Sequence, residues 1–273
     1  MATPVTLGAV LYDPKVSVIW EIICDFFEQN GVPVDPVFFT NYERQVDTLI
    51  SGSIDIAWNS PLAWLDTQRR SGNRFRAVAM RDTDRDRESC FVVKKGSGIG
   101  RLADLRGKRV AMGAADSPQA TLIPIEVLRR AGLAAGTDVE IRRFDVAVGK
   151  HGDHVGGERD AFGALASGQV DASTMLDLNW QAWTGDGTID AGEFAVLAST
   201  GTFDHCVFAV RDDFPSDLVE RWTSVLLSMR YDNPKHREMM DMEGLKEWLP
   251  GRTSGFELLT AAVEHQRFFG HNV

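Results

Sequence analysis

Gly52–Ala57 (GSIDIA) and Gly168–Ser173 (GQVDAS) are two copies of one short pattern, in which a glycine precedes an aspartate that stands between two apolar residues. Each copy follows a stretch with apolar residues at helical spacing, and the glycine suits the left-handed position that ends a helix. The pattern therefore predicts a helix, a glycine stop and a short buried strand in both places. The copies begin at residues 52 and 168, too far apart for a solenoid repeat but suitable for two similar α/β lobes.

Lobes of this kind bind small ligands where the carboxyl ends of strands meet the N-termini of helices. We therefore expect an α/β protein with two lobes and a ligand cleft between them. The expected crossings of the chain assign residues 1–88 to the first part of lobe 1, residues 89–206 to lobe 2, and residues 207–273, with the C-terminal helices, to the second part of lobe 1. Because any α/β protein can reuse a helix, glycine and strand phrase, the repeat alone leaves a different α/β fold open.

Apolar periodicity and turn residues predict the individual elements. Strands are expected at residues 5–11, 34–39, 54–58, 76–80, 91–94, 110–112, 139–144 and 206–210, and helices at residues 15–29, 61–69, 117–130, 217–230, 238–248 and 256–268, with a further helix that carries Tyr42. Residues 81–88 alternate in charge, so we expect a solvated loop there. Asn41 and Ser60 stand where helix N-caps are expected.

The chain is acidic: its 273 residues carry a formal net charge of −10, and its pI is near 5.1. This charge argues against a nucleic-acid partner, because no basic stripe is available to neutralise phosphates. The apolar runs fall far short of the ~20 residues of a spanning helix, so we expect no membrane insertion. The first residues lack the pattern of a secretion signal. We expect a periplasmic or other extracytoplasmic location if a signal peptide has been removed, and a cytoplasmic location otherwise.

The chain carries no strong motif for a metal or a cofactor. Cys24, Cys90 and Cys206 are scattered, and we interpret them as small buried hydrophobes. Residues 151–154 hold two histidines and an aspartate without an established ligand spacing, so we expect no metal site. The glycine-rich residues 149–157 lack the Lys-Ser/Thr ending of a phosphate-binding loop, and no cofactor is expected.

Two longer phrases resemble a known family. Gly98–Gly113 (GIGRLADLRGKRVAMG) and Ser117–Leu133 (SPQATLIPIEVLRRAGL) are similar to type II periplasmic binding proteins, specifically the phosphate, phosphite and phosphonate branch of ABC-transporter binding proteins. Phrases around Tyr42, His154 and Asp204 fall where that branch has comparable ones, and the resemblance covers most of residues 5–215. It implies a two-lobed fold and a protein that captures a small anionic ligand for ABC transport or sensing.

In that family the anionic head of the ligand binds helix N-termini. The helices expected to begin near Ser60 and Ser117 offer unpaired amides and a positive dipole end for this purpose. The resemblance implies ligand-binding roles for Tyr42 and His154 as donors, for Gln119 beside Ser117, and for Asp177 and Asp204 as acceptors of a cationic or hydroxyl group. It implies no catalytic residue, and its partners are a small anion and a transporter permease. We expect a monomer.

Two departures leave the ligand open. Ser117, Pro118 and Gln119 stand where phosphonate binders have a hydroxyl-rich triplet, and Ser89 lies near the position where a second tyrosine is expected. A carboxylate, a sulfonate or a smaller oxyanion therefore fits as well as a phosphonate. Aromatic residues that could wall the site are Trp58, Trp64 and Trp180.

Several of these side chains also have a purely structural interpretation. Tyr42 can be an ordinary tyrosine on a helix surface, Ser117 an N-cap, and Asp204 part of a salt bridge near the crossing between lobes. An enzyme of the decarboxylase or desulfinase kind on the same fold is the alternative function. It would draw its acid and base groups from His154, His205, Asp204 and Asp177, with Cys206 adjacent. No nucleophile and base stand at a diagnostic spacing, so the binding protein is the favoured hypothesis.

Overall fold

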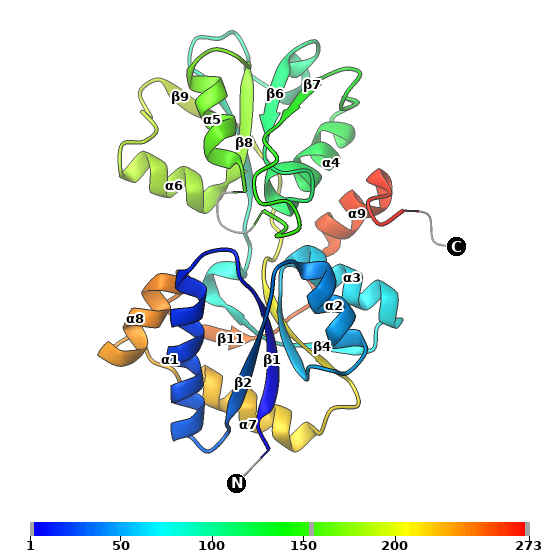
Figure 1. Ribbon diagram of the computed structural model, residues 1–273. Helices are drawn as coiled ribbons and strands as arrows, with labels where there is room; N and C mark the ends of the chain where they lie inside the picture. The colour runs from blue at the N-terminus through cyan, green and yellow to red at the C-terminus, as the bar shows by residue number, and fades with distance from the viewer. Residues whose placement is uncertain (1–2, 153–155, 271–273) are drawn as a thin grey trace. The chain divides into compact units, whose positions relative to one another are not determined.

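The computed structural model describes residues 3–152 and 156–270, which form two compact units (Figure 1). Unit 1 consists of Met1–Arg85 and Asp204–Phe256, and unit 2 of Asp86–Phe203 and Glu257–Val273. The chain thus passes between the units three times, after residues 85, 203 and 256. No helix within the described ranges is both long and apolar enough to cross a membrane.

Unit 1 is built on a six-stranded mixed sheet with the order β11-β4-β10-β3-β1-β2. Its strands are β1 (Val5–Val10), β2 (Val34–Phe39), β3 (Ile56–Asn59), β4 (Phe75–Arg81), β10 (Val207–Arg211) and β11 (Trp248–Pro250). β1 pairs in parallel with β2 and β3, whereas β10 runs antiparallel to β3 and β4. The helices are α1 (Lys15–Gln29), α2 (Tyr42–Ile50), α3 (Pro61–Ser71), α7 (Ser216–Leu227) and α8 (Pro234–Glu243), with a short 3-10 helix at Asp82–Asp84.

The core of unit 1 lies on both sides of this sheet, because the central strands are buried on both faces. Phe208 of β10 packs edge-on against Trp222 of α7, whose ring in turn stacks on Phe27 of α1 at 5.2 Å. Aromatic side chains of α1, α7 and β10 therefore belong to one continuous cluster. Trp58 and Trp64 are buried in the clusters on the two sides of the sheet.

Unit 2 contains a five-stranded sheet with the order β7-β6-β8-β5-β9. Its strands are β5 (Ser89–Lys94), β6 (Arg109–Met112), β7 (Glu140–Arg143), β8 (Ala172–Leu176) and β9 (Phe194–Ser199). Its helices are α4 (Ile123–Arg130), α5 (Glu158–Ala166), α6 (Asp177–Gly185) and α9 (Glu257–Gln266), with a π-helical turn at Pro118–Leu122 before α4 and a 3-10 helix at Leu102–Leu105. β6 is parallel to β7 and β8, and β5 is antiparallel to β8 and β9.

The predicted repeat is confirmed in both units. α2 ends before Gly52, and α5 ends before Gly168; both glycines have the left-handed backbone, with φ of 78° and 72°. The strands that follow these glycines are β3 and β8. β3 pairs in parallel with β1, and β8 pairs in parallel with β6. The two units therefore use the same phrase at the same structural step.

The C-terminal part departs from what the sequence predicted. We expected residues 207–273 to return to the first lobe, but α9 belongs to unit 2, where it packs on α4 and Gln266 Nε2 donates to the Leu122 carbonyl at 2.8 Å. The expected helix at residues 238–248 is also wrong at its end. Gly244, with φ of 73°, terminates α8, and Trp248 begins β11, which pairs with β4.

Candidate functional site

Polar residues gather at one edge of the sheet of unit 1. This edge holds the carboxyl ends of β1 and β3 and the first residues of β10, since Val207 pairs with Asn59 in antiparallel register. Gln45 of α2 is fully buried there, and its Nε2 donates at 2.9 Å both to the Trp58 carbonyl and to Asn59 Oδ1. The edge is thus polar and internally hydrogen-bonded, which is the place where α/β sheets bind ligands.

Tyr42 and Ser60 begin the two helices that leave this edge. Tyr42, only 1% exposed, packs with Val10, Val46 and Ala63, so the interpretation as a surface tyrosine is wrong. Ser60 is the predicted N-cap of α3: its Oγ accepts from the Ala63 amide at 3.1 Å. The ligand contacts expected of Tyr42 and Ser60 remain predictions.

Asp204 lies at the same end of unit 1 and is fully buried. Its carboxylate receives two bonds of 2.6 Å from Nε and Nη2 of Arg252, and its own amide donates to the Gly255 carbonyl at 2.7 Å. The salt bridge predicted for Asp204 is therefore present, and Arg252 is its partner. A cationic ligand group would have to share this carboxylate with Arg252, and that role stays a prediction.

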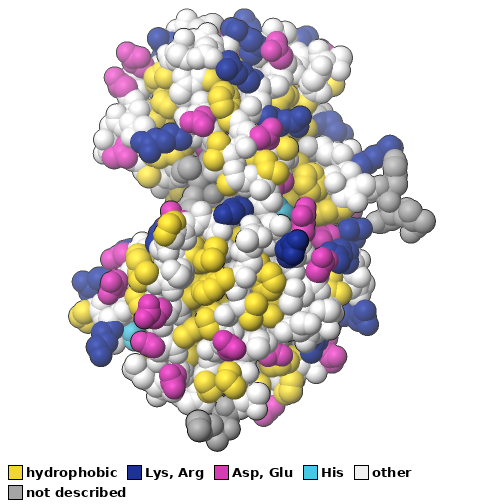
Figure 2. Space-filling view, viewed as in Figure 1, with side chains coloured by type: hydrophobic (Ala, Val, Ile, Leu, Met, Phe, Trp, Pro, Cys, Tyr) yellow, Lys and Arg dark blue, Asp and Glu magenta, His cyan; other side chains and the backbone are white. Residues whose placement is uncertain are grey.

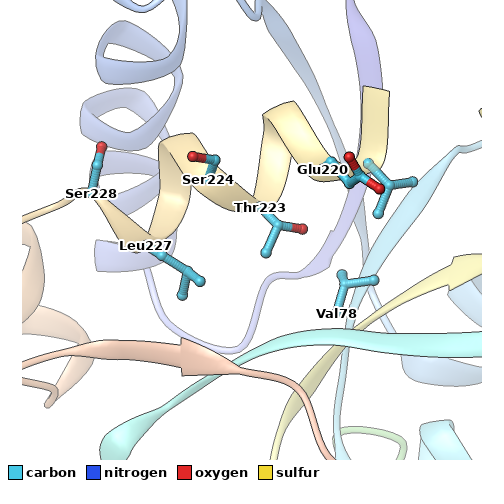
Figure 3. Close-up of a pocket in the computed structure, with 7 residues that line it drawn as sticks. Val78, Glu220, Thr223, Ser224, Leu227 and Ser228 are labelled. Carbon is cyan, nitrogen blue, oxygen red and sulfur yellow. The ribbon is translucent and has the colours of Figure 1, made fainter. Parts of the chain in front are cut away.

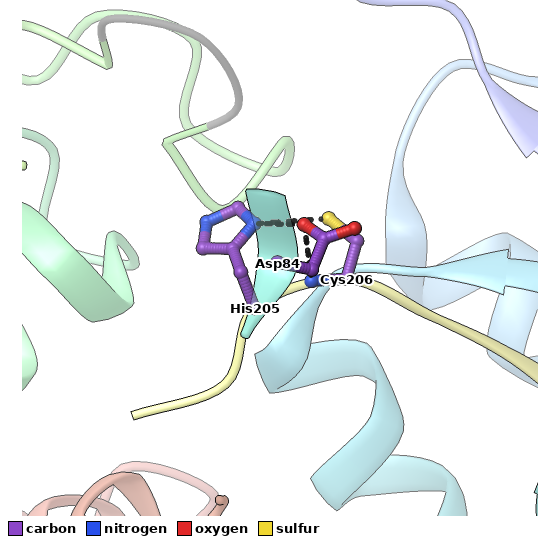
Figure 4. Close-up of side chains that lie close together, drawn as sticks. All are labelled: Asp84, His205 and Cys206. Carbon is purple, nitrogen blue, oxygen red and sulfur yellow. Dashed lines mark hydrogen bonds and ion pairs between the residues drawn. The ribbon is translucent and has the colours of Figure 1, made fainter. Parts of the chain in front are cut away.

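Asp84, His205 and Cys206 form a buried cluster beside β10 (Figure 4). His205 Nδ1 lies 3.1 Å from Cys206 Sγ and 3.5 Å from Asp84 Oδ1. Arg81 donates to both Asp84 oxygens at 2.7 Å. Burial alone would raise the pKa of Asp84, but the charge of Arg81 outweighs it and holds that pKa well below its usual range.

This cluster has a structural role. Although three potential ligand atoms lie close together, the guanidinium of Arg81 already occupies the carboxylate and would repel a divalent cation. The contacts instead join the segment after β4 to the start of β10. The prediction of a solvated loop at residues 81–88 is accordingly wrong at Asp84, which is 1% exposed because Arg81 folds back onto it.

A pocket on unit 1 lies along α7, above β4 (Figure 3). Its described lining is largely apolar and hydroxyl-bearing, and Glu220 is the charged residue within it. None of the predicted ligand-binding residues is part of this described lining, so the pocket is separate from the candidate site. On the face shown in Figure 2, basic and acidic side chains are interspersed.

Unit 2 has an equivalent polar edge. It holds the carboxyl ends of β6 and β8 together with the start of β5, because Ser89 pairs with Leu176 in antiparallel register. Ser117, fully buried, caps the helical segment that follows β6: its Oγ accepts from the Ala120 amide at 3.1 Å. The Ser117 amide donates to the Ala114 carbonyl at 3.0 Å. The N-cap interpretation of Ser117 is confirmed, and its contact with a ligand stays a prediction.

The helical segment opens with a π-helical turn, in which the Leu122 amide donates to the Ser117 carbonyl at 3.0 Å. In an α-helix the Ala120 carbonyl would accept from residue 124, but Pro124 has no N–H. Thr174 of β8 takes its place, since its Oγ1 donates to the Ala120 carbonyl at 2.6 Å. Ser89 Oγ likewise donates to the Gln119 carbonyl at 2.6 Å. Two strand hydroxyls thus hold the start of this helix against the sheet edge.

Gln119 and Asp177 each keep one buried oxygen without a hydrogen-bond partner among the described residues. Gln119 Nε2 donates to the Gly152 carbonyl at 2.9 Å, which leaves its Oε1 unsatisfied. Asp177 begins α6, and its Oδ2 lies 3.4 Å from Arg87 Nη1, which leaves Oδ1 unsatisfied. Burial raises the pKa of Asp177, in opposition to the charge of Arg87.

Glu158 is the residue of this edge that the sequence did not predict. It is the first residue of α5 and is fully buried; its Oε2 accepts from the Leu176 amide at 2.8 Å and from Asn179 Nδ2 at 2.7 Å. Burial raises the pKa of Glu158 to about 7. An acidic residue in the first turn of a helix is ordinarily an exposed partner of the helix dipole, so the sequence alone gave no signal of this burial.

Other predicted residues lie in the segment before α5. His154 and Asp153 lie outside the described residues. His151 is buried, and burial lowers its pKa to about 3, so the imidazole is neutral near pH 7.

Trp180 is partly buried against the core of unit 2. The Cys24 thiol is half-buried, whereas Cys90 and Cys206 are buried as expected.

Comparisons with known proteins agree with this architecture. The family model for the periplasmic substrate-binding protein of phosphonate ABC transporters matches residues 15–255. The probable ABC transporter phosphite binding protein PhnD1 of Prochlorococcus marinus (strain MIT 9301) is 22% identical over 240 residues, which are 84% of this chain and 77% of that protein.

Solved structures extend the agreement to the fold. PhnD1 of Prochlorococcus marinus in complex with methylphosphonate has a TM-score of 0.71 at 17% identity, covering 96% of this chain and 98% of that one. XAC2383 of Xanthomonas citri bound to ATP has a TM-score of 0.72 at 17% identity, covering 100% of both chains. The aliphatic sulphonate binding protein SsuA of Escherichia coli has a TM-score of 0.56 at 16% identity, covering 97% and 84%. The expected α/β binding-protein fold is confirmed.

Proposed function

The chain belongs to the family of periplasmic substrate-binding proteins of phosphonate ABC transporters, and we propose that it captures a small phosphorus oxyanion, a phosphonate or phosphite, for such a transporter. Membership of this family supports a solute-binding function and disfavours the enzyme alternative. The ligand class is the finer step. The observation that supports it is the match of the phosphonate model over residues 15–255, together with the named relative PhnD1.

The polar edges of the two units supply the groups that such a ligand needs. In unit 1 we assign contacts to Tyr42 and Ser60, with Asp204 available for a donor on the ligand. In unit 2 we assign them to Ser117, Gln119 and Asp177, around the start of the helix after β6. We retain the predicted donor His154 and the predicted cleft between the lobes as parts of this proposal.

The remaining parts of the proposal concern partners and location. Members of the family are periplasmic, and we propose the same location for this protein. We propose that it delivers its ligand to a transporter permease, that it acts as a monomer, and that it neither binds nucleic acid nor inserts into a membrane. The net charge of −10 supports the absence of a nucleic-acid partner.

Ligand binding tests the proposed function directly. Methylphosphonate, phosphite, phosphate, methanesulfonate and acetate are titrated by calorimetry and in thermal unfolding, with chloride as the control anion. We expect a phosphorus oxyanion to bind and to stabilise the fold by about 2.7 kcal/mol at a hundredfold excess over Kd. If no phosphorus oxyanion gives heat or raises Tm, the proposed ligand class is wrong.

A further inference from the structure

Glu158 differs from the other deeply buried carboxylates of this protein. Asp84, Glu126 and Asp204, all at most 1% exposed, each pair with at least one arginine. Glu158 is 0% exposed, and within residues 3–152 and 156–270 no basic side chain forms an ion pair with it. Buried carboxylates are normally paired because an isolated charge is costly to remove from water. The environment of Glu158 therefore calls for a proton or for a further partner.

The vacant hydrogen-bonding capacity lies on one oxygen. Glu158 Oε2 already accepts two bonds, whereas the buried Oε1 has no partner among the described residues. Gln119 and Asp177, from the same sheet edge, each present a second unsatisfied oxygen. Glu158 Oε2 accepts from the Leu176 amide, directly before Asp177, and Gln119 Nε2 donates to the Gly152 carbonyl in the segment before α5, so the three side chains belong to the same edge of the sheet. Three acceptor oxygens without donors suit a ligand that brings hydrogen-bond donors.

The charges around Glu158 sharpen this requirement. Asp177 on α6 opposes ionisation of Glu158, and Arg87 is engaged 3.4 Å from the Asp177 carboxylate. The neighbouring Cys90 thiol of β5 is neutral, because burial and the charges of Asp177 and Glu88 raise its pKa to about 11. If neither the approaching anion nor Glu158 carries a proton, the anion meets the ionised carboxylate of Glu158. Such like charges repel strongly when they are removed from water.

We propose that Glu158 contacts the bound anion and shares one proton with it, so that the site favours an oxyanion that can carry a proton, a phosphonate or phosphite, over a sulfonate, which carries none. This inference rests on the proposed function and adds the residue that sets the selectivity. With a phosphonate, the proton comes from either the ligand or Glu158. With a sulfonate, Glu158 must supply it, and the raised pKa of Glu158 limits this to pH values up to about 7.

The test compares methylphosphonate with methanesulfonate, which have the same shape but differ in the proton. Calorimetry gives both Kd values at pH 5.5 and pH 8.5 for the wild type and for Glu158→Gln. We expect the wild-type ratio of sulfonate Kd to phosphonate Kd to rise about tenfold or more between the two pH values, because sulfonate binding loses its proton source. The ratio cancels the effect of any group that acts equally on both anions.

Glu158→Gln replaces the shared proton by an amide donor that does not titrate. At pH 8.5 we expect it to shift the ratio about tenfold or more toward methanesulfonate. Glu126→Gln is the matched control: it changes another fully buried glutamate of unit 2, one that pairs with Arg129 and Arg130, and it should leave the ratio unchanged.

Each result decides between named alternatives. A ratio that is the same in Glu158→Gln and wild type overturns the role of Glu158 but leaves the proposed function intact. If Glu158→Gln does not fold, the wild-type pH series decides alone, and a ratio that is constant with pH overturns the inference. If neither anion binds the wild type at either pH, both the inference and the proposed ligand class fail.

Discussion

Asp55 and Asp171 make the same hydrogen bond in the two units. Asp55 Oδ2 accepts from the Thr6 amide and Asp171 Oδ2 from the Arg109 amide, in both cases at 2.9 Å. Each aspartate also donates its own amide back to the carbonyl of that partner, at 3.0 and 2.8 Å. The aspartate of the repeated phrase thus ties the loop before a strand to the start of the neighbouring parallel strand.

This relationship predicts the effect of removing either carboxylate. We expect Asp55→Ala and Asp171→Ala each to lower the free energy of unfolding by about 1–2 kcal/mol, because a strand amide loses its acceptor. Asp55→Ala should cost more, since the Thr6 hydroxyl also donates to that oxygen at 2.7 Å. Urea unfolding measures both values. Equal stability of Asp55→Ala and wild type would contradict the prediction.

Asp84→Asn should be among the most damaging conservative changes in unit 1. It removes one of the two counter-ions of Arg81, which donates twice to this buried carboxylate and also pairs with Glu243, and breaking a buried pair costs about 3–5 kcal/mol. The matched control is Asp104→Asn, in an exposed pair with Arg101, for which we expect no measurable loss. Urea unfolding of the two variants side by side is the measurement, and similar stabilities would refute the prediction.

Thr174 and Pro124 should be energetically coupled through the Ala120 carbonyl. Thr174→Val removes the hydroxyl that donates to that buried carbonyl and should cost about 1–3 kcal/mol. Pro124→Ala restores an N–H at the position that an α-helix would use, so the double variant should recover part of the loss. A double-mutant cycle in urea measures the coupling. Strictly additive effects would show that Thr174 does not substitute for the missing amide.

Ser117→Ala separates capping from ligand contact. Loss of the cap on the Ala120 amide should lower stability by about 1 kcal/mol. The proposed contact with the anion should in addition weaken ligand binding severalfold. Asn233→Ala, which removes the N-cap of α8, is the control that should lower stability without changing affinity. Calorimetry on both variants decides, and unchanged affinity in Ser117→Ala would remove this residue from the site.

The ligand-free stability of the protein should depend on pH through Glu158. Its pKa rises from 4.5 in the unfolded chain to about 7 in the folded protein, so the folded state binds the proton more tightly. The stabilisation by that proton is complete below about pH 4.5 and is lost as pH rises through 7, a change on the order of 3 kcal/mol. Glu158→Gln should lack this component. Urea unfolding at pH 5 and pH 8.5 compares the two proteins, and an identical pH dependence would contradict the assignment.

Local signals were sufficient for much of the fold. α1 spans Lys15–Gln29 and β2 spans Val34–Phe39, as periodicity and turn residues predicted, because each element has a clear apolar pattern and a clear stop. The N-caps of α2 and α3 were predicted for the same reason. The fate of Trp248 was not, since its place in β11 depends on pairing with the distant strand β4.

The candidate site was less accessible to sequence reasoning. Ser117 could be found from its position before a helix, but nothing local shows that Glu158 is buried without a counter-ion. The burial of Asp84 likewise depends on Arg81 and on Cys206, just before β10, whereas the alternating charges of residues 81–88 predicted a solvated loop. Such features arise from contacts between segments far apart in sequence, and the pattern within each segment does not contain them.

The placement of α9 sets the order in which the units can be completed during synthesis. Unit 1 has all of its segments once residue 256 has left the ribosome, whereas unit 2, begun much earlier at residue 86, still lacks its last helix. Until α9 arrives, the surface of α4 that it contacts has no cover from this helix. During synthesis the chain therefore completes unit 1 first, although part of unit 2 is inserted within it. Unit 2 is completed afterwards, when α9 is added.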